Sequence, residues 1–261
     1  STGNKTASLS ITHNAAGSPS SLSLVGNGVA PSPVIQLSAT ALAFDATQVG
    51  TTSQQTFAVT NPGTASLSIT SIAVTGANRG IGLAIARALA REGANLVLIG
   101  RDRRALARAA RGLGGDARVA LADVTRPADV RRAFRQIRKS AGRLDALVNN
   151  AGVFTYKPFV RTTLEDWETS IATNLTSLFL VTQAALPVLQ RGRDAHLINI
   201  LSVSSRVAFA NCSAYSAAKF GALGLTRVLR KELRALGIRV TAILPGSTNT
   251  RMADQFDFPV H

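Results

Sequence analysis

The sequence predicts an α/β fold in which a doubly wound parallel sheet has helices on both faces, preceded by a small all-β segment. From residue 72 onward, short apolar runs alternate with helical patterns, which is typical of parallel strands joined by helices. A glycine-rich turn, residues 75–82, lies between the first apolar run and the first helical pattern. Before residue 72, short alternating runs and frequent turn residues are typical of antiparallel strands.

The parallel sheet is expected to contain six strands connected by helices. The predicted strands cover residues 72–74, 95–99, 118–122, 146–148, 197–201 and 239–244. The predicted helices cover residues 83–91, 102–111, 167–189 and 215–236, and a further helix begins near Pro127. Proline suits a helix start because its missing N–H would have no partner there. Thr163 and Asp166 suit the start of the 167–189 helix.

The first 71 residues are rich in Ser, Thr, Ala and Gly. Runs at residues 8–12, 21–25 and 56–60 alternate apolar and polar side chains, which predicts half-buried strands of an antiparallel β-sandwich. The string Thr-Ala-Ser-Leu-Ser-Ile-Thr occurs twice, at residues 6–12 and 64–70. Such self-similarity indicates a segment taken from a repeat array.

This segment resembles the immunoglobulin-like ASH (choice-of-anchor) repeats of bacterial surface and cilia-associated proteins. Residues 1–29 are similar to the end of one repeat and residues 34–71 to the beginning of the next. The resemblance therefore implies an incomplete immunoglobulin-like segment over residues 1–71, followed by a second domain over 72–261. The alternation shifts phase near Thr70 and Ser71, so we expect a bend there, with the strand 72–74 belonging to the parallel sheet.

Composition and charge exclude several function classes. The net charge is +15, and nearly all of the charged residues follow residue 78. The basic groups at residues 101–111 and 131–139 fall at helical spacings around apolar residues, which we interpret as solvated outer helix faces. Apart from Phe134 on the apolar side of the second group, no aromatic residue interleaves with them to stack bases, which argues against single-stranded nucleic acid. Nucleic acid is therefore not the expected partner, and a basic nucleic-acid binder stays the alternative that the charge supports.

The remaining composition argues against disulfides, metals and membranes. The single cysteine, Cys212, excludes an intrachain disulfide. The three histidines lie far apart in the sequence and no Cys/His pair has ligand spacing, so no metal site is predicted. We find no signal peptide and no apolar run long enough for a transmembrane segment. We therefore expect a cytoplasmic protein, although the first segment would also suit an envelope or secreted protein.

The turn at residues 75–82 has the pattern of a dinucleotide-binding loop. Gly76 permits a tight turn after the strand, Gly80 allows the backbone to approach a pyrophosphate, and Gly82 allows the helix to pack closely on the sheet. The unpaired N–H groups at the helix start then face the phosphate charge.

A second set of residues can carry acid–base chemistry. Tyr215 and Lys219 are four residues apart, so on a helix they share a face. A nearby ammonium favours the phenolate and is expected to lower the pKa of the tyrosine. Ser202 follows the fifth predicted strand, where its hydroxyl can donate to a carbonyl oxygen that gains negative charge.

Together these motifs resemble the classical short-chain dehydrogenases/reductases over residues 72–252. The motifs are the glycine turn, Asn149-Asn150-Ala151-Gly152, Ser202 and Tyr215-Ser216-Ala217-Ala218-Lys219. The resemblance implies one Rossmann-like domain and hydride transfer between a nicotinamide and a carbonyl or secondary alcohol, the small-molecule substrate. It implies that Tyr215 moves the proton, Ser202 holds the substrate oxygen, Lys219 also binds the ribose, and Asn174 keeps a water in the proton relay.

The resemblance also implies a set of cofactor-binding residues, two of which suggest the choice of cofactor. Gly100 stands at the end of the second strand, where NAD enzymes usually have an acid. Arg79 and Arg101 suit the 2′-phosphate of NADP(H), whereas Asp102 keeps NAD(H) open as the alternative. The complete set is Gly76, Asn78, Arg79, Gly80, Ile81, Gly82, Arg101, Asp123, Val124, Asn150, Ala151, Gly152, Tyr215, Lys219, Pro245, Gly246, Thr248 and Thr250.

The sequence departs from the family pattern near its end. Family members normally continue beyond the Pro245-Gly246 loop into a substrate-covering helix and a seventh strand, but this chain ends at His261. We therefore expect a C-terminally truncated domain without its last strand and with impaired activity. The alternative is a catalytically inactive chimera of a cofactor-binding fold with a β-sandwich anchoring module. The resemblance further implies a homodimer through the helices around residues 166–189 and 215–236.

Overall fold

The computed structural model of the chain describes residues 71–114, 117–248, 250 and 252 in full. In the first 70 residues it describes the backbone of four strands, β1 (Gly3–Ile11), β2 (Ser20–Gly28), β3 (Gln36–Leu37) and β4 (Val59–Thr60). Strands β1 and β2 pair antiparallel, with Gly3 opposite Gly28 and Ile11 opposite Ser20. Antiparallel pairing agrees with the strands predicted at 8–12 and 21–25. The rest of the predicted immunoglobulin-like segment lies outside the described residues, so the sandwich and the domain boundary stay predictions.

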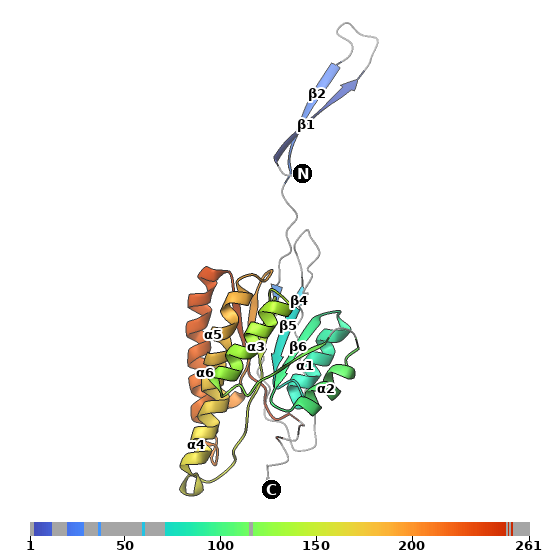
Figure 1. Ribbon diagram of the computed structural model, residues 1–261. Helices are drawn as coiled ribbons and strands as arrows, with labels where there is room; N and C mark the ends of the chain where they lie inside the picture. The colour runs from blue at the N-terminus through green and yellow to red at the C-terminus, as the bar shows by residue number, and fades with distance from the viewer. Residues whose placement is uncertain are drawn as a thin grey trace. The chain divides into compact units, whose positions relative to one another are not determined.

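The six strands of the second unit form one parallel sheet (Figure 1). They are β5 (Ser71–Thr75), β6 (Asn95–Gly100), β7 (Arg118–Leu121), β8 (Ala146–Asn149), β9 (His196–Ile200) and β10 (Arg239–Ile243), in the order β10-β9-β8-β5-β6-β7. Ile72 pairs with both Leu96 and Ala146. The strand at the junction therefore belongs to the parallel sheet, as predicted. The direction of winding reverses between β5 and β8, and open α/β sheets bind ligands at such a switch point.

Helices cover both faces of this sheet (Figure 1). The α-helices are α1 (Gly80–Arg91), α2 (Arg103–Arg111), α3 (Pro127–Ser140), α4 (Leu164–Ile171), α5 (Ser177–Leu189) and α6 (Ser213–Glu232). The 3₁₀ turns are η1 (Phe159–Arg161), η3 (Val203–Ser205) and η4 (Leu233–Leu236). One π-helical turn, η2 (Ala172–Thr176), separates α4 from α5. Pro127 is the first residue of α3, in agreement with the prediction.

Alternate residues of the central strands pack on opposite helix layers. Val74 and Leu98 belong to the core that α1 and α2 cover, through Ala86 and Leu106. Val97, Leu147 and Leu197 belong to the core on the other face, with Ile137 of α3 and Val181 of α5. The central strands are thus buried on both faces, which explains why the sequence shows continuous apolar runs there.

A buried carboxylate fixes the start of the central strand. Asp145, which precedes β8, accepts a hydrogen bond from the Ser71 N–H (3.1 Å) and another from the Arg193 N–H (2.8 Å). Arg143 pairs with the same carboxylate at 3.4 Å. These contacts join the beginning of β5 to the segment between α5 and β9, at the edge of the sheet opposite the glycine turn.

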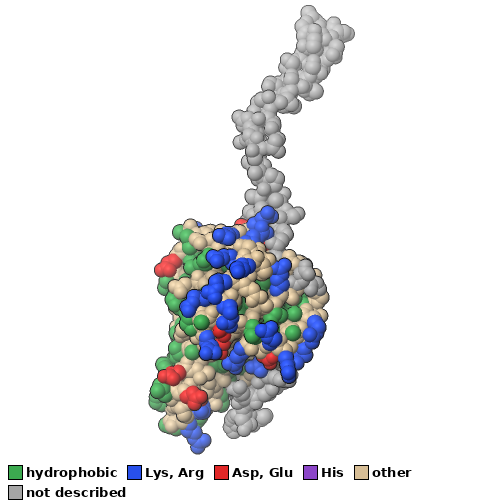
Figure 2. All heavy atoms as spheres, viewed as in Figure 1, with side chains coloured by type: hydrophobic (Ala, Val, Ile, Leu, Met, Phe, Trp, Pro, Cys, Tyr) green, Lys and Arg blue, Asp and Glu red, His purple; other side chains and the backbone are tan. Residues whose placement is uncertain are grey.

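The basic helices match the interpretation made from the sequence. Figure 2 shows Lys and Arg side chains (blue) spread over the face in view. On α3, Arg131, Arg135 and Arg138 are exposed, while Val130, Phe134 and Ile137 are buried. The basic residues therefore occupy the solvated outer face of the helix.

One helical stretch could span a membrane by length and composition alone. Among the fully described residues, one 18-residue window of Leu164–Leu189 has a mean hydropathy of 1.4. The prediction of no transmembrane segment considered only uninterrupted apolar runs and did not identify this stretch. Its apolar residues include Val181, Ala185, Val188 and Leu189, which are buried in the sheet–helix core. A core helix has the same composition, so the stretch is weak support for membrane insertion.

Candidate active site

The loops that follow β5 and β8 are joined at the carboxyl edge of the sheet. The Thr75 hydroxyl accepts hydrogen bonds from the N–H groups of Asn150 (2.9 Å) and Ala151 (3.0 Å). In return, the Asn150 side-chain amide donates to the Thr75 carbonyl at 3.0 Å. The structure therefore brings the glycine turn and the Asn149–Gly152 motif together. Thr75 was not among the predicted site residues, since a threonine at a strand end has no distinctive sequence signal.

The glycines of the turn are required by its geometry. Gly76 has a φ of +63°, and a Cβ there would lie 3.0 Å from the Ala151 Cα. A Cβ at Gly82 would overlap the Gly76 carbonyl and the Asn150 amide. Gly80 also has a positive φ of +54°, but a Cβ there would meet only the Thr250 side chain, at 3.5 Å. The turn is therefore a cradle of bare backbone.

This cradle fits a phosphate group. No side chain caps the first N–H groups of α1, since the N-cap residue Arg79 makes no cap hydrogen bond. Uncapped N–H groups at a helix start attract anions. Asn78 and Ile81 are half-buried in the turn, and Arg79 is exposed beside it. The Thr250 side chain lies against Gly80, so this residue of the segment after β10 is beside the cradle; its role in cofactor binding stays a prediction.

The other predicted cofactor residues lie at the same edge of the sheet. Arg101 follows β6 and is exposed. Asp102 accepts a hydrogen bond from the Ala105 N–H at 2.9 Å and so caps α2. Asp123, after β7, accepts from the Thr125 N–H and hydroxyl at 3.0 and 2.7 Å. The Val124 side chain is buried in the core, which leaves only its backbone for a cofactor.

The loop after β10 lies beside the turn that follows β9. Val203, in η3, donates its N–H to the Pro245 carbonyl at 3.0 Å. The Thr248 hydroxyl donates to the Gly246 carbonyl at 3.2 Å. Pro245 and Gly246 therefore lie close to the segment that carries Ser202. Thr248 itself is exposed.

Three predicted catalytic residues meet where β9 and α6 approach each other. The Ser202 side chain lies close enough to the Tyr215 phenol to lower its pKa against the effect of burial. The Ser202 Oγ also accepts from the Ser204 N–H at 3.1 Å. The Lys219 Nζ lies 5.6 Å from the centre of the Tyr215 ring and donates to the Ile200 carbonyl at 3.3 Å. All three residues are buried.

Burial dominates the electrostatics of this group. It raises the pKa of the Tyr215 phenol, and the hydrogen bond with Ser202 acts against this rise. It also lowers the pKa of Lys219 to about 8. The expectation that Lys219 would lower the pKa of Tyr215 is therefore wrong for the free protein. Removal of water from the phenol is the main cause of the rise, and Lys219 is not among the groups that shift the pKa of Tyr215.

Asn174 lies in the π-helical turn η2 and is buried. Its Oδ1 accepts from the Val153 N–H at 3.1 Å, and its Nδ2 donates to the Val153 carbonyl at 3.0 Å and to the Ser170 hydroxyl at 3.1 Å. A Cβ at Gly152 would lie 2.9 Å from the Asn174 Oδ1 and 3.9 Å from the Lys219 Nζ. Asn174 therefore holds the loop after β8 close to Lys219.

A chain of buried polar side chains lies behind the site. The Asn149 amide donates to the Thr182 hydroxyl and to the Asn199 side-chain oxygen, each at 3.0 Å. The Asn199 amide in turn donates to the Thr226 hydroxyl at 2.9 Å. These contacts connect β8 and β9 to α5 and α6. Sequence reasoning missed Asn199, for which the asparagine within an otherwise apolar strand was an available signal.

Two aromatic residues that the sequence reasoning also missed lie beside Tyr215. The Phe154 ring makes a T-shaped contact with the Tyr215 ring, with centres 4.8 Å apart. The Tyr156 ring stacks on Phe154 at 6.2 Å, and its hydroxyl accepts from the Asn211 amide at 3.1 Å. They occupy a loop far from Tyr215 in the sequence, so only the fold reveals this contact.

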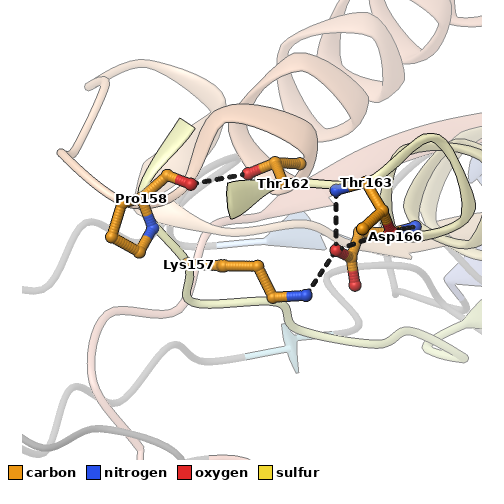
Figure 3. A network of polar contacts seen from close by, with 5 residues as sticks. All are labelled: Lys157, Pro158, Thr162, Thr163 and Asp166. Atoms are coloured by element: carbon orange, nitrogen blue, oxygen red, sulfur yellow. Dashed lines mark hydrogen bonds and ion pairs between the residues drawn. The ribbon is translucent and has the colours of Figure 1, made fainter. Parts of the chain in front are cut away.

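The same loop is fixed to the start of α4 (Figure 3). Lys157 forms an ion pair with Asp166. Asp166 also accepts from the N–H and hydroxyl of Thr163, each at 2.9 Å, while the Thr163 hydroxyl caps the Asp166 N–H. The hydrogen bond from Lys157 is the main cause that lowers the pKa of Asp166 to about 2. The helix start predicted from Thr163 and Asp166 is confirmed.

Comparison with known proteins gives the same fold and family. Residues 70–258 match the short chain dehydrogenase family. The chain is 37% identical over 180 residues to the 3-oxoacyl-[acyl-carrier-protein] reductase of Bos taurus, covering 69% of this chain and 76% of that protein.

Two solved structures hold nicotinamide cofactors. A metagenomic short-chain oxidoreductase in complex with NADP has a TM-score of 0.65 and 36% identity, covering 70% of this chain and 84% of that one. The 3-ketoacyl-(acyl-carrier-protein) reductase of Brucella melitensis complexed with NADH has a TM-score of 0.70 and 28% identity, covering 73% and 80%. One relative holds NADP and the other NADH, so these structures support a nicotinamide cofactor without choosing between the two.

Fold, site and sequence therefore agree. A parallel sheet carries a glycine cradle at the carboxyl edge of its central strand, and a serine, a tyrosine and a lysine meet two strands away. The family match covers well over half of the chain. The chain belongs to the short-chain dehydrogenase family and is an oxidoreductase.

Proposed function

We propose that this protein is an NADP(H)-dependent oxidoreductase that interconverts a carbonyl compound and its secondary alcohol. The observation that carries the proposal is that Ser202, Tyr215 and Lys219 are buried together, with the Lys219 Nζ 5.6 Å from the centre of the tyrosine ring. The relatives named as reductases of 3-oxoacyl or 3-ketoacyl groups support a carbonyl substrate.

The proposed chemistry divides between cofactor and protein. A bound nicotinamide supplies or takes the hydride at the carbonyl carbon. In the direction of reduction, the Tyr215 hydroxyl gives its proton to the carbonyl oxygen, and the Ser202 hydroxyl donates a hydrogen bond to the same oxygen as negative charge develops there. The Lys219 ammonium stabilises the phenolate that remains after proton transfer.

Charge around the cradle supports NADP(H) over NAD(H). Arg79 and Arg101 are exposed beside the cradle and at the end of β6, where two guanidinium groups suit a 2′-phosphate. The carboxylate of Asp102 is engaged as the N-cap of α2. This engagement competes with a hydrogen bond to a ribose 2′-hydroxyl, which an NAD enzyme requires of its acid.

Substitution of Tyr215 tests the reaction. The Tyr215→Phe variant should lose NADPH-dependent reduction of ketones, because the ring remains but the proton donor is removed. Loss of NADPH absorbance with a panel of ketones measures the rate, and a thermal shift with NADPH checks that the variant still binds cofactor. Unchanged reduction by the variant would refute the assignment. Cofactor binding by the wild type without turnover on any ketone would favour the inactive alternative.

Substitution of Arg101 tests the cofactor preference. Arg101→Ala should weaken NADPH binding by about tenfold and leave NADH binding unchanged, because one charged hydrogen bond to phosphate is lost. The matched control is Arg108→Ala, which removes an exposed arginine of α2, the helix that follows Arg101. Dissociation constants follow from thermal shifts at a series of cofactor concentrations. If Arg101→Ala weakened the binding of NADPH and NADH by the same factor, the assignment of Arg101 to the 2′-phosphate would be contradicted.

A further inference from the structure

Two loops that precede Tyr215 in the chain carry aromatic side chains, one of which is in contact with the Tyr215 ring, and the inference drawn from them rests on the proposed function. The first loop follows β8 and carries Phe154 and Tyr156, both half-buried. The second follows η3 and carries Phe209, about half exposed. The first loop begins after the Asn149–Gly152 motif, and the second loop connects Ser202 to the helix that carries Tyr215. Both therefore flank the hydroxyls at which a carbonyl oxygen would bind.

Asn211 joins the two loops. It has a left-handed backbone, with a φ of 63°, and asparagine tolerates that conformation better than most residues. Its carbonyl accepts from the Lys157 N–H at 2.7 Å. Its side-chain amide donates to the Tyr156 hydroxyl at 3.1 Å. One residue thus holds the first loop through both its backbone and its side chain.

The first loop is also fixed on its other side. Lys157 pairs with Asp166 at the start of α4, beside the capping threonine (Figure 3). Asn174 holds the backbone of Val153 through two hydrogen bonds. The residues on either side of Phe154 are therefore anchored by three elements, and a wall held in this way loses little conformational entropy when a ligand binds.

The rings in this wall have a defined order. Asn211 contacts the Tyr156 hydroxyl, Tyr156 stacks on Phe154, and the Phe154 ring makes a T-shaped contact with the Tyr215 ring at an interplanar angle of 82°. The Phe154 ring, with its centre 4.8 Å from that of the Tyr215 ring, is thus the aromatic neighbour of the proposed proton donor. Aromatic rings bind flat apolar groups through buried area and through edge-to-face or offset contacts.

We propose that Phe154 and Tyr156 form the wall of the substrate site, that they select ketones with an aromatic substituent beside the carbonyl, and that Asn211 positions this wall. Phe154 and Tyr156 are the selecting residues. Asn211 is a positioning residue that acts through Tyr156. Phe154 is distinct from the acid–base residues, so its loss should alter substrate choice more than it alters the chemistry.

The first test compares two ketones that differ in one aromatic ring. Wild-type protein with NADPH should have a higher kcat/KM for acetophenone than for butanone. In Phe154→Ala, kcat/KM for acetophenone should fall by at least about tenfold through KM, with a much smaller change for butanone. The matched control is Phe159→Ala, because Phe159 lies in the same connection but is 78% exposed.

The second test isolates the hydrogen bond made by Asn211. Asn211→Gly keeps a residue that accepts the positive φ and removes only the side-chain amide, whereas Tyr156→Phe removes the hydroxyl that this amide contacts. Each should weaken the preference for acetophenone by a similar factor, and the double variant should be no worse than either one. If Asn211 had a merely structural role, Asn211→Gly would lower kcat/KM equally for acetophenone and for butanone. That result would overturn its assignment as a positioning residue.

The third measurement separates this inference from the proposed function. Saturation-transfer NMR on the NADP-loaded protein detects binding of acetophenone and butanone whether or not turnover occurs. Stronger transfer to acetophenone that is lost in Phe154→Ala supports the aromatic wall even if the enzyme is slow. Equal transfer to both ketones, or a preference that survives in Phe154→Ala, overturns it. The oxidoreductase proposal fails on a different result, which is ketone reduction that persists in Tyr215→Phe.

Discussion

A buried ammonium next to a buried phenol sets the chemistry of the site. Lys219 is one helical turn after Tyr215 and donates to the Ile200 carbonyl at 3.3 Å. Burial lowers the pKa of Lys219 to about 8 and raises that of Tyr215. In the protein without ligand, burial therefore favours the neutral amine of Lys219 and the neutral phenol of Tyr215. A cofactor and substrate that replace water with polar contacts would alter this balance at the step where the proton moves.

The lowered pKa of Lys219 predicts a pH-dependent stability. The unfolded lysine titrates near 10.5 and the folded one near 8, so between these values the unfolded state binds more protons. The free energy of unfolding therefore rises with pH in this window, and the contribution is lost as pH falls through 8. Relative to Lys219→Met, the wild type should gain about 3 kcal/mol across the window. Urea unfolding of both proteins from pH 7 to 11 measures this gain, and an equal dependence of the two unfolding free energies on pH would contradict it.

Several residues of the site could be assigned from the sequence because their chemistry needs fixed spacings. Gly76 precedes a helix and Gly82 lies in its first turn. Tyr215 and Lys219 share a helical face, so local geometry alone relates the members of each pair. Phe154 and Asn211 could not be assigned, since their contacts depend on how two distant loops meet. The pKa of Tyr215 was also beyond reach, because it depends on burial that only tertiary packing determines.

At the scale of elements, the strands were the most predictable part of the fold. β5, β6 and β8 are buried on both faces, so their apolar runs are continuous and end at turn residues. The long helix predicted over 167–189 is interrupted by the π-helical turn at Ala172–Thr176. An extra residue in one turn leaves no mark in the hydrophobic period. The π-helical turn contains Asn174, whose side chain forms hydrogen bonds with the backbone of Val153. π-Bulges of this kind are frequent at functional sites.

The start of α4 offers a test of one element. Thr163→Ala removes the side chain that caps the Asp166 N–H and should lower the free energy of unfolding by about 1 kcal/mol. Thr169→Ala makes the same substitution at an exposed position within the same helix and is the control. Urea denaturation compares the two variants. If Thr163→Ala is as stable as Thr169→Ala, the cap does not stabilise the fold.

At the scale of the whole molecule, an apolar stripe lies on the outer face of α6. Phe220 and Val228 are 44% and 49% exposed, and they are two helical turns apart, on the face opposite Tyr215 and Lys219. Trp167 of α4 and Phe179 of α5 are also exposed. Figure 2 shows hydrophobic side chains (green) on the side of the unit formed by these helices. This face is the one at which the sequence predicted a homodimer, and apolar patches of this kind mark such interfaces.

Sedimentation tests the predicted homodimer. The wild type should sediment as a dimer, and Phe220→Glu should shift it toward monomer, because a carboxylate would be buried in the apolar interface. Val160→Glu places the same charge at a position that is 90% exposed in η1 and should remain dimeric. A monomeric wild type would refute the prediction.

The hydrogen bond between Asn149 and Asn199, behind the site, affects how turnover responds to substitutions in the buried interior. Asn149 and Asn199 are directly opposite each other on β8 and β9, and the residues immediately beyond them carry the loop of Gly152 and the hydroxyl of Ser202. Their amide contact therefore fixes the distance between the cofactor-binding and substrate-binding ends of adjacent strands. Replacing this contact with hydrocarbon of equal volume would preserve the interior of the protein yet free those two ends to slide, and turnover would fall while the fold survived.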